Sequence, residues 1–226
     1  MKVEIWSDVV CPWCYVGKRR FESALDAFPH KEGVEVVWRS FELDPNAPRV
    51  REGAVIDHLA AKYGVSHEEA QAMQQRVVEA AAAEGLELRF DRARGGNTFD
   101  AHRLLHLAAA HGLQGELKER LLRAYFSDGR PVGDAAALRD VAVEAGLAAG
   151  EVDDVLGSDR YGDAVRADEA EARALGAGAV PFFVIDRAYG LSGAHPAQVF
   201  TNMLERAWAE THDDAAEAAP GAAASA

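Results

Sequence analysis

The chain contains two cysteines, and both lie in one tetrapeptide, Cys11-Pro12-Trp13-Cys14. The tetrapeptide follows an apolar run that predicts a strand over residues 2–6, and it begins a run with helical periodicity over residues 12–28. Thiols separated by two residues at a helix start can form a small disulfide and open it again. The helix dipole and free N–H groups lower the pKa of the first thiol. A zinc site needs more ligands than this pair supplies, so the pattern favours redox chemistry.

The composition makes structural disulfides unnecessary and limits the partners. Hydrophobic residues form 49% of the 226-residue chain, which is enough for a proper core. The formal net charge of −13 argues against nucleic acids and anionic membranes as partners. No segment is long enough to span a membrane, and Glu4 and Asp8 interrupt the apolar stretch that a signal peptide requires. We therefore expect a soluble, cytoplasmic protein whose two thiols cycle between redox states.

The order of predicted elements changes twice along the chain. A second strand over 34–41 completes a β-α-β unit, with the cysteines at the carboxyl end of its first strand, where active-site groups commonly gather. Only helical patterns follow, over about 53–63, 66–85, 97–112, 115–128, 134–146 and 150–175. Strands return at 182–186 and 188–191 as a hairpin across Asp186-Arg187, and a helix follows over 195–211.

This order predicts an α/β chain in which a long all-helical insertion interrupts a thioredoxin fold. We expect the N-terminal half of that fold over 1–45, the helical insertion domain over 46–176 and the C-terminal half over 177–211. Residues 212–226, rich in Ala, Glu, Pro and Gly, read as a disordered tail.

Four stretches resemble the DsbA-related thioredoxin family, and within it the FrnE-like branch. They are SDVVCPWCYVG at 7–17, NTFDAHR at 97–103, AGAVPFF at 177–183 and, more weakly, SGA at 192–194. The similarity extends over about residues 2–210. It implies a DsbA-like thiol–disulfide oxidoreductase that oxidises, reduces or isomerises disulfides of a protein or small-molecule substrate. It also implies a redox partner such as a thioredoxin or a low-molecular-weight thiol, and no bound cofactor or metal.

The resemblance also assigns roles to individual residues. Cys11 would attack, the more buried Cys14 would resolve the mixed disulfide, and Pro12 and Trp13 would tune the redox potential and the contact surface. Because neither intervening residue is charged, the helix terminus must provide most of the thiolate stabilisation. We therefore expect a reduction potential of roughly −150 to −250 mV.

The resemblance implies a cis peptide bond between Val180 and Pro181, with Pro181 packed beside the cysteines as part of the catalytic site. Because proline has no N–H and cannot continue a normal strand, the backbone of Val180 is left free to pair with an extended substrate.

A second hypothesis comes from relatives of another class. Kappa-type glutathione transferases and 2-hydroxychromene-2-carboxylate isomerases resemble this chain in the helical insertion and the valine–proline turn. Their first active-site residue is typically a serine, whereas this chain has Cys11. A glutathione-dependent isomerase or transferase of polyketide or aromatic metabolism is therefore the alternative. Glutathione would then be a co-substrate, with Asn97, Ser192 and Gly193 as candidate contacts. A third hypothesis is a binding or holdase module in which the thiols are incidental.

The sequence does not decide the roles of three further polar residues. His102 and His106 are four residues apart on a predicted helix, but no other ligand pattern completes a metal site, so we expect them on a helix surface or between helices. Asp8 could relay protons near Cys14 or cap the turn before the helix. Among the aromatics, we expect Trp6 in the core and Trp13 facing outward.

Overall fold

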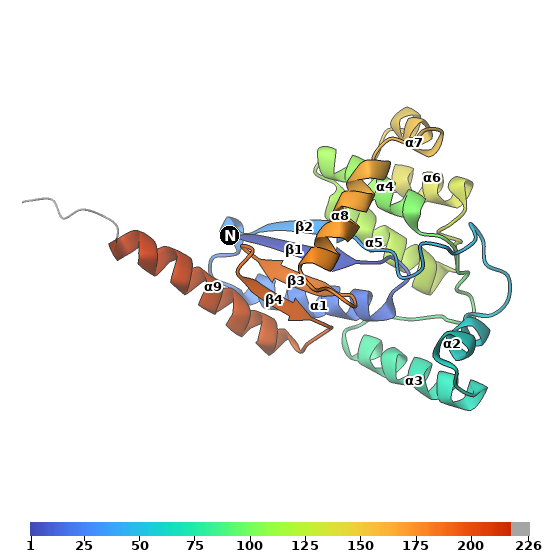
Figure 1. Ribbon diagram of the computed structural model, residues 1–226, viewed down its shortest axis with the longest axis horizontal. Helices are drawn as coiled ribbons and strands as arrows, with labels where there is room; N and C mark the ends of the chain where they lie inside the picture. Colours follow the sequence, from blue (N-terminus) through green and yellow to red (C-terminus); the bar gives the residue numbers. More distant parts are fainter. Residues whose placement is uncertain (218–226) are drawn as a thin grey trace, which may run out of the picture.

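The computed structural model describes residues 1–217, and its strands form a single sheet with the order β2-β1-β3-β4 (Figure 1). Strand β1 (Lys2–Ser7) pairs in parallel with β2 (Glu35–Ser40), and helix α1 (Pro12–Ala27) connects the two strands. Strand β3 (Phe182–Ile185) is antiparallel to β1, and β4 (Tyr189–Ser192) is antiparallel to β3. The predicted thioredoxin fold is confirmed.

Successive side chains of β1 point to opposite faces of the sheet, and different helices cover these two faces. Val3 and Ile5 belong to the core under α1 and α9 (Ala197–Glu217), whereas the indole N–H of Trp6 donates to the carbonyl of Asp168 in α8 (Gly162–Ala174) at 2.8 Å. Val3 to Ser7 are all buried, as expected for a strand covered on both sides. Trp6 is therefore a core residue, as predicted.

The hairpin between β3 and β4 turns at Asp186 and Arg187, which have φ values of 46° and 61°. Two successive positive φ angles are the signature of a type I′ turn, whose twist matches that of the strands. The carboxylate of Asp186 accepts a hydrogen bond from the backbone N–H of Lys2 at 2.6 Å, which ties the turn to the start of β1. The predicted hairpin is confirmed.

Between β2 and β3 the described chain is helical, as predicted. Figure 1 shows α2 and α3 as a pair set apart from the sheet, and α4 to α7 grouped together. The elements are α2 (Val55–Tyr63), α3 (His67–Ala83), α4 (Phe99–Ala110), α5 (Gln114–Arg123), the π-helical turn η2 (Ala124–Asp128), α6 (Ala135–Glu144), α7 (Ala149–Leu156) and α8; the short turn η1 (Lys31–Gly33) precedes β2.

The single helix predicted over 150–175 is wrong, because α7 and α8 are separate. Arg103 is buried, and its guanidinium donates to the carbonyls of Val155 and Ser158 at 2.5 and 2.6 Å. These carbonyls therefore point to the arginine instead of continuing a helix, and Tyr161, with φ of 66°, begins the next one. The last helix also differs in length: α9 extends to Glu217, farther than predicted, and residues 218–226 of the predicted tail lie outside the described residues.

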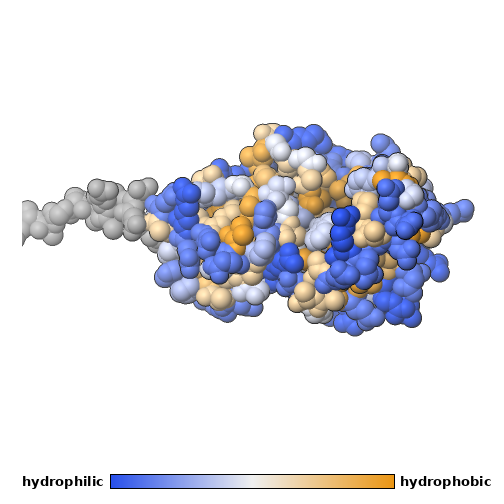
Figure 2. Space-filling model, turned by 90° about the horizontal axis from the view of Figure 1, so that it is seen from below, coloured by the Kyte–Doolittle hydropathy of each residue, from blue (hydrophilic) through white to orange (hydrophobic). Residues whose placement is uncertain are grey.

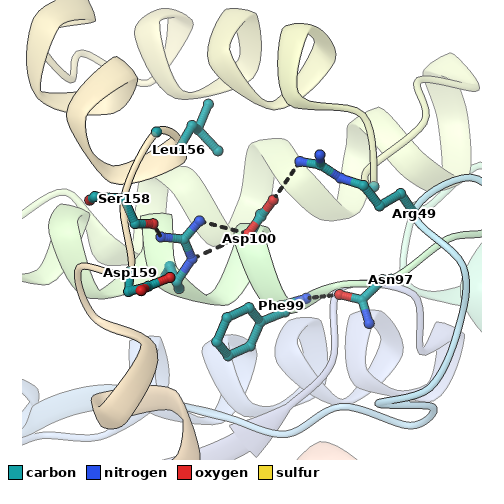
Figure 3. Close-up of a pocket in the computed structure, with 10 residues that line it drawn as sticks. Arg49, Asn97, Phe99, Asp100, Leu156, Ser158 and Asp159 are labelled. Carbon is teal, nitrogen blue, oxygen red and sulfur yellow. Dashed lines mark hydrogen bonds and ion pairs between the residues drawn. The ribbon is translucent and has the colours of Figure 1, made fainter.

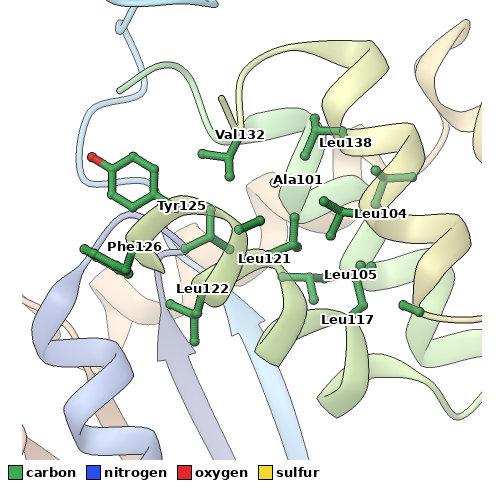
Figure 4. Close-up of a cluster of buried hydrophobic side chains, with 14 of the residues drawn as sticks. Ala101, Leu104, Leu105, Leu117, Leu121, Leu122, Tyr125, Phe126, Val132 and Leu138 are labelled. Carbon is green, nitrogen blue, oxygen red and sulfur yellow. The ribbon is translucent and has the colours of Figure 1, made fainter. Parts of the chain in front are cut away.

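The helices pack on a leucine-rich core that also includes part of α1. Figure 4 shows Leu117 and Leu121 of α5 close to Leu104 of α4. Tyr15 and Val16 of α1 belong to the same cluster, so the helical block and the thioredoxin half share one helix. None of the helices described is long and apolar enough to cross a membrane. On the face in Figure 2, apolar residues form small separate patches among hydrophilic ones.

Candidate functional site

The two cysteines lie where β1 passes into α1. After Ser7 the chain turns through residues 8–10, and Cys11 is the N-cap residue of α1, with an extended backbone. Pro12 occupies the first helical position, where its missing N–H costs nothing. Both thiols are free; Cys11 is 5% exposed and Cys14 is 1% exposed. Cys11 borders a cavity and Cys14 is packed behind it, so an incoming molecule meets Cys11 first.

The Val180–Pro181 peptide bond is cis, as predicted. Sγ of Cys11 lies 3.7 Å from the carbonyl oxygen of Val180, so residues 169 positions apart meet at one site. Gly17 makes this approach possible, because a Cβ at this position would lie 2.9 Å from Cγ of Pro181. The site therefore depends on Gly17, which ends the resembling stretch 7–17 but was given no role from the sequence.

The two thiols titrate as a coupled pair, in which one thiol ionises readily and the other resists ionisation. Burial opposes the thiolate of Cys14, but the hydrogen bond from Cys11 and the positive charge of Lys118 outweigh it and lower the pKa of Cys14. The hydrogen bond with Cys14, together with burial, raises the pKa of Cys11 well above its usual value. The pair thus loses its first proton readily and its second with difficulty. In this geometry the lowered pKa falls on Cys14, and not on Cys11 as the helix position alone predicted.

Lys118 reaches the two cysteines from α5 and was not among the predicted site residues. Its side chain is fully buried, and its Nζ donates to the carbonyl of Ser7 at 3.1 Å. The ammonium group also lies 5.6 Å from the centre of the Trp38 ring. Burial lowers the pKa of Lys118 to about 8. The helical block thereby supplies a cation to the site on the thioredoxin half.

Asp8 links the site to two other segments. Its carboxylate accepts a hydrogen bond from the backbone N–H of Leu43 at 2.8 Å and lies 3.3 Å from Nε2 of His102. His102 and the Leu43 N–H lower the pKa of Asp8 against the effect of burial. The carboxylate of Asp8 is thus directed to Leu43 and His102 and not to the turn before the helix, which was one of its two predicted roles.

The two histidines take up structural positions. His102 is completely buried beside Asp8, whereas Nε2 of His106 lies 3.2 Å from both the Ser40 hydroxyl and the Asp168 carboxylate. Over residues 1–217, no three His, Cys, Asp or Glu side chains are grouped so that they could hold a metal ion.

A cavity of about 420 Å³ opens beside Cys11. This volume is within the range of pockets that bind small molecules. One wall consists of Cys11, Pro12, Trp13 and Val180, and Trp13 is 42% exposed, as predicted for a residue that faces outward. The rest of the lining comes from α2, α3, η2 and the loop after α3, and it is mainly apolar, with Val55, Leu59, Met73, Val77, Phe90 and Tyr125. Three basic side chains also line the cavity: Arg51, His58 and Lys62.

The predicted contacts Asn97, Ser192 and Gly193 do not line this cavity. The Asn97 amide donates to the carbonyl of Pro45 at 3.2 Å, and its oxygen accepts from the N–H of Phe99 at 2.9 Å. Asn97 lines a second hollow of about 530 Å³, in which Arg49 pairs with Asp100 at 3.0 Å (Figure 3).

Ser192 and Gly193 lie next to the segment that begins with the cis proline. Ser192 pairs with Phe182 at the end of β4, and the N–H of Gly193 donates to the carbonyl of Pro181 at 2.8 Å. The structure therefore brings together Cys11, Cys14, Pro181 and Val180. Ser192 and Gly193 lie next to Phe182 and Pro181, whereas Asn97 lies at the second hollow.

Comparison with known proteins agrees with this geometry. Residues 2–205 match the family described as the DSBA-like thioredoxin domain. A probable DsbA oxidoreductase of Streptomyces coelicolor is 56% identical, with a TM-score of 0.89 over 93% of this chain and 91% of that one.

Two more distant structures share the fold. The cytosolic disulfide reductase DsbM of Pseudomonas aeruginosa, solved with GSH, is 18% identical, with a TM-score of 0.62 over 94% of this chain and 98% of its own. A 2-hydroxychromene-2-carboxylate isomerase is 12% identical, with a TM-score of 0.66 over 94% and 98% of the two chains.

Proposed function

Because the chain belongs to the DSBA-like thioredoxin domain family, we propose that it is a thiol–disulfide oxidoreductase in which Cys11 and Cys14 cycle between dithiol and disulfide. The observation that carries the proposal is the position of Cys11. Its sulfur borders the cavity and meets the carbonyl of Val180, while Cys14 lies behind it. A substrate sulfur can therefore reach Cys11 from the cavity, and Cys14 is placed to displace it afterwards.

The reaction has two exchange steps. Cys11 passes its proton to the thiolate of Cys14 and attacks one sulfur of a substrate disulfide; the electron pair of the broken S–S bond leaves on the other sulfur, which takes up that proton. Cys14, again as thiolate, then attacks Cys11, so that the Cys11–Cys14 disulfide forms and the second substrate thiolate departs. The substrate gains two electrons and the cysteine pair loses them; the reverse sequence oxidises a substrate dithiol. Pro12 and Trp13 tune the potential, and Trp13 contacts the substrate at the cavity mouth.

The cavity supports a small anionic thiol as one partner. Its apolar wall and the side chains of His58 and Lys62 suit a molecule with a compact body and carboxylates, such as glutathione, whereas Arg51 is already paired with Asp44 of the same cavity. We propose glutathione or a similar low-molecular-weight thiol as the co-substrate, in the cytoplasm. Asn97, Ser192 and Gly193 act indirectly, by holding the loops around the site.

A second candidate function is a glutathione-dependent isomerase or transferase. The small-molecule cavity and the fold shared with the 2-hydroxychromene-2-carboxylate isomerase favour it. Such an enzyme needs one group that activates the glutathione thiol, so its turnover would survive the loss of Cys14.

Single cysteine substitutions test the proposal. We expect Cys11→Ser to abolish reduction of insulin and of a small aromatic disulfide, because no thiol then borders the cavity. Cys14→Ser should lose steady turnover and accumulate a mixed disulfide on Cys11, detectable as a mass increase that dithiothreitol removes. Turnover in both variants would contradict dithiol catalysis. Glutathione conjugation or isomerisation that persists in Cys14→Ser would support the second function instead.

A further inference from the structure

Lys118 is a buried cation without a carboxylate to neutralise it. Its side chain is 0% exposed, its hydrogen bond goes to the neutral carbonyl of Ser7, and within residues 1–217 it forms no ion pair. A buried ammonium group of this kind is costly unless a negative charge lies near it. The next residue, Glu119, does not provide this negative charge, because its carboxylate binds Lys18 and Arg19 of α1.

The charged and titratable groups around Lys118 leave one candidate for that negative charge. The thiols of Cys11 and Cys14, the carboxylate of Asp8 and, with opposite effect, the ammonium group of Lys18 all act on it electrostatically. Asp8 is already held by His102 and by the backbone N–H of Leu43. Lys18 is bound to Glu22 and Glu119. The anion that remains is the single thiolate of the cysteine pair.

We propose that Lys118 is the electrostatic partner of the Cys14 thiolate and a positioning residue for the step that resolves the mixed disulfide. This inference rests on the proposed dithiol function. In that step Cys14, as thiolate, attacks the sulfur of Cys11, the bond from Cys11 to the substrate sulfur breaks, and the substrate thiolate leaves and takes a proton from water. Lys118 holds the attacking thiolate in its ionised form but does not itself form or break a bond.

The same arrangement links the charge of Lys118 to the redox state. When the Cys11–Cys14 disulfide forms, the thiolate disappears and Lys118 loses its counter-ion. The ammonium group then releases its proton more easily than it does in the dithiol protein. Oxidation of the pair is thereby coupled to loss of a proton from α5, in the helical block.

The first test needs no substitution of Lys118. In the full-length protein with lysines labelled at Cε, the chemical shift of Lys118 is followed against pH in the reduced and the oxidised states. We expect a higher pKa in the reduced state, and equal values in the two states would overturn the inference. The cysteine variants described above test the dithiol function separately, so the two proposals can fail independently.

The second test compares Lys118→Met, which keeps length and loses charge, with Lys118→Arg, which keeps charge. In a Cys11→Ser background, thiolate absorbance against pH should show a Cys14 pKa raised by about one unit in the methionine variant, equivalent to a tenfold change. With Cys11 present, resolution of a mixed disulfide with glutathione should slow about tenfold, and Lys118→Arg should restore much of the rate. A methionine variant that folds normally and keeps both the pKa and the rate would overturn the proposal.

Discussion

At the scale of single residues, a hydrogen atom at Gly17 decides whether the two halves of the redox site meet. The ring of Pro181 packs on α1 at the position where any other residue would place its Cβ, and Ala194 closes the same contact at 3.4 Å. An added methyl group must move the proline ring or the helix, since both are held by backbone. Cys11 and Val180 would then separate.

We therefore expect Gly17→Ala to lower the free energy of unfolding by about 1–3 kcal/mol and to slow disulfide exchange. Gly115→Ala is the matched control, because Gly115 also lies in a helix but has no heavy atom within 4 Å of the added Cβ. The control should keep full activity and gain up to about 1 kcal/mol from helix propensity. Urea unfolding and the exchange rate with glutathione measure both quantities. Equal behaviour of the two alanine variants would contradict the contact.

Two further glycines, Gly96 and Gly133, are required by a close approach of the backbone. The carbonyl oxygen of Arg49 would lie 2.2 Å from a Cβ at Gly96 and 1.7 Å from one at Gly133. The segment after β2 therefore passes between two loops that only glycines can bring so close. This requirement is purely one of packing.

The site residues that could be predicted were those that belong to a short sequence motif. Cys11, Cys14 and Trp13 belong to one motif, and Pro181 follows a recognisable valine. The roles of Gly17 and Lys118 could not be predicted in this way, because each residue matters only through a partner about 100 or more residues away. The periodicity of α5 places Lys118 beside Leu117 and Leu121 on the buried side, which is the only signal the sequence offers.

At the scale of elements, Glu119 joins α5 to α1. Its carboxylate binds Lys18 at 2.6 Å, accepts a hydrogen bond from the hydroxyl of Tyr15 at 2.8 Å and pairs with Arg19. Although burial opposes ionisation, these partners lower the pKa of Glu119 to about 2. A folded-state pKa below that of the unfolded chain means that the contribution to stability is complete above about pH 4.5. It is lost as the pH falls toward 2.

We expect Glu119→Gln to cost about 2 kcal/mol of unfolding free energy at pH 7, after allowance for partial exposure. The difference from the parent protein should shrink between pH 4.5 and 2, because the parent loses the same charge there. Glu116→Gln on the same helix is the control: its pair with Arg120 is exposed and should contribute no more than about 0.5 kcal/mol. A constant difference across this pH range would show that the charge of Glu119 is not what stabilises the contact.

The elements themselves were largely predictable, but their ends were not. Alternation and periodicity indicated the strands and most helices, whereas the break between α7 and α8 depends on the distant guanidinium of Arg103. The stretch predicted as a helix over 115–128 ends as the π-helical turn η2. That turn sends Tyr125 to the cavity and Phe126 to the core. Such changes of backbone follow from packing and leave no clear local pattern.

At the scale of the whole molecule, the helical block is not an independent appendage. Tyr15 and Val16 of α1 lie in its core, Trp6 of the sheet binds α8, and Arg20 of α1 pairs with Glu84 at 2.6 Å. These contacts cross between the thioredoxin half and the insertion at several places. The sequence indicated an interruption of the fold but could not indicate how closely the two parts are joined.

We therefore expect both parts to unfold together, with equal calorimetric and van't Hoff enthalpies. Leu104→Ala, in the core of the helical block, should lower the stability reported by sheet tryptophan fluorescence as much as that reported by helical circular dichroism, by about 2–5 kcal/mol. A change confined to one signal, or two separate transitions, would contradict this coupling.

The cavity is lined by residues from two separate parts of the chain, and this arrangement can be used in protein engineering. The sulfurs, Trp13 and Val180 stand on the thioredoxin half, whereas much of the facing wall belongs to α2 and α3, a helical pair set apart from the sheet (Figure 1). Under the proposed function, the residues that react and most of those that would contact the partner molecule therefore belong to different segments. Exchanging residues 55–83 between relatives offers a way to redirect the enzyme to new molecules while its redox couple stays unaltered.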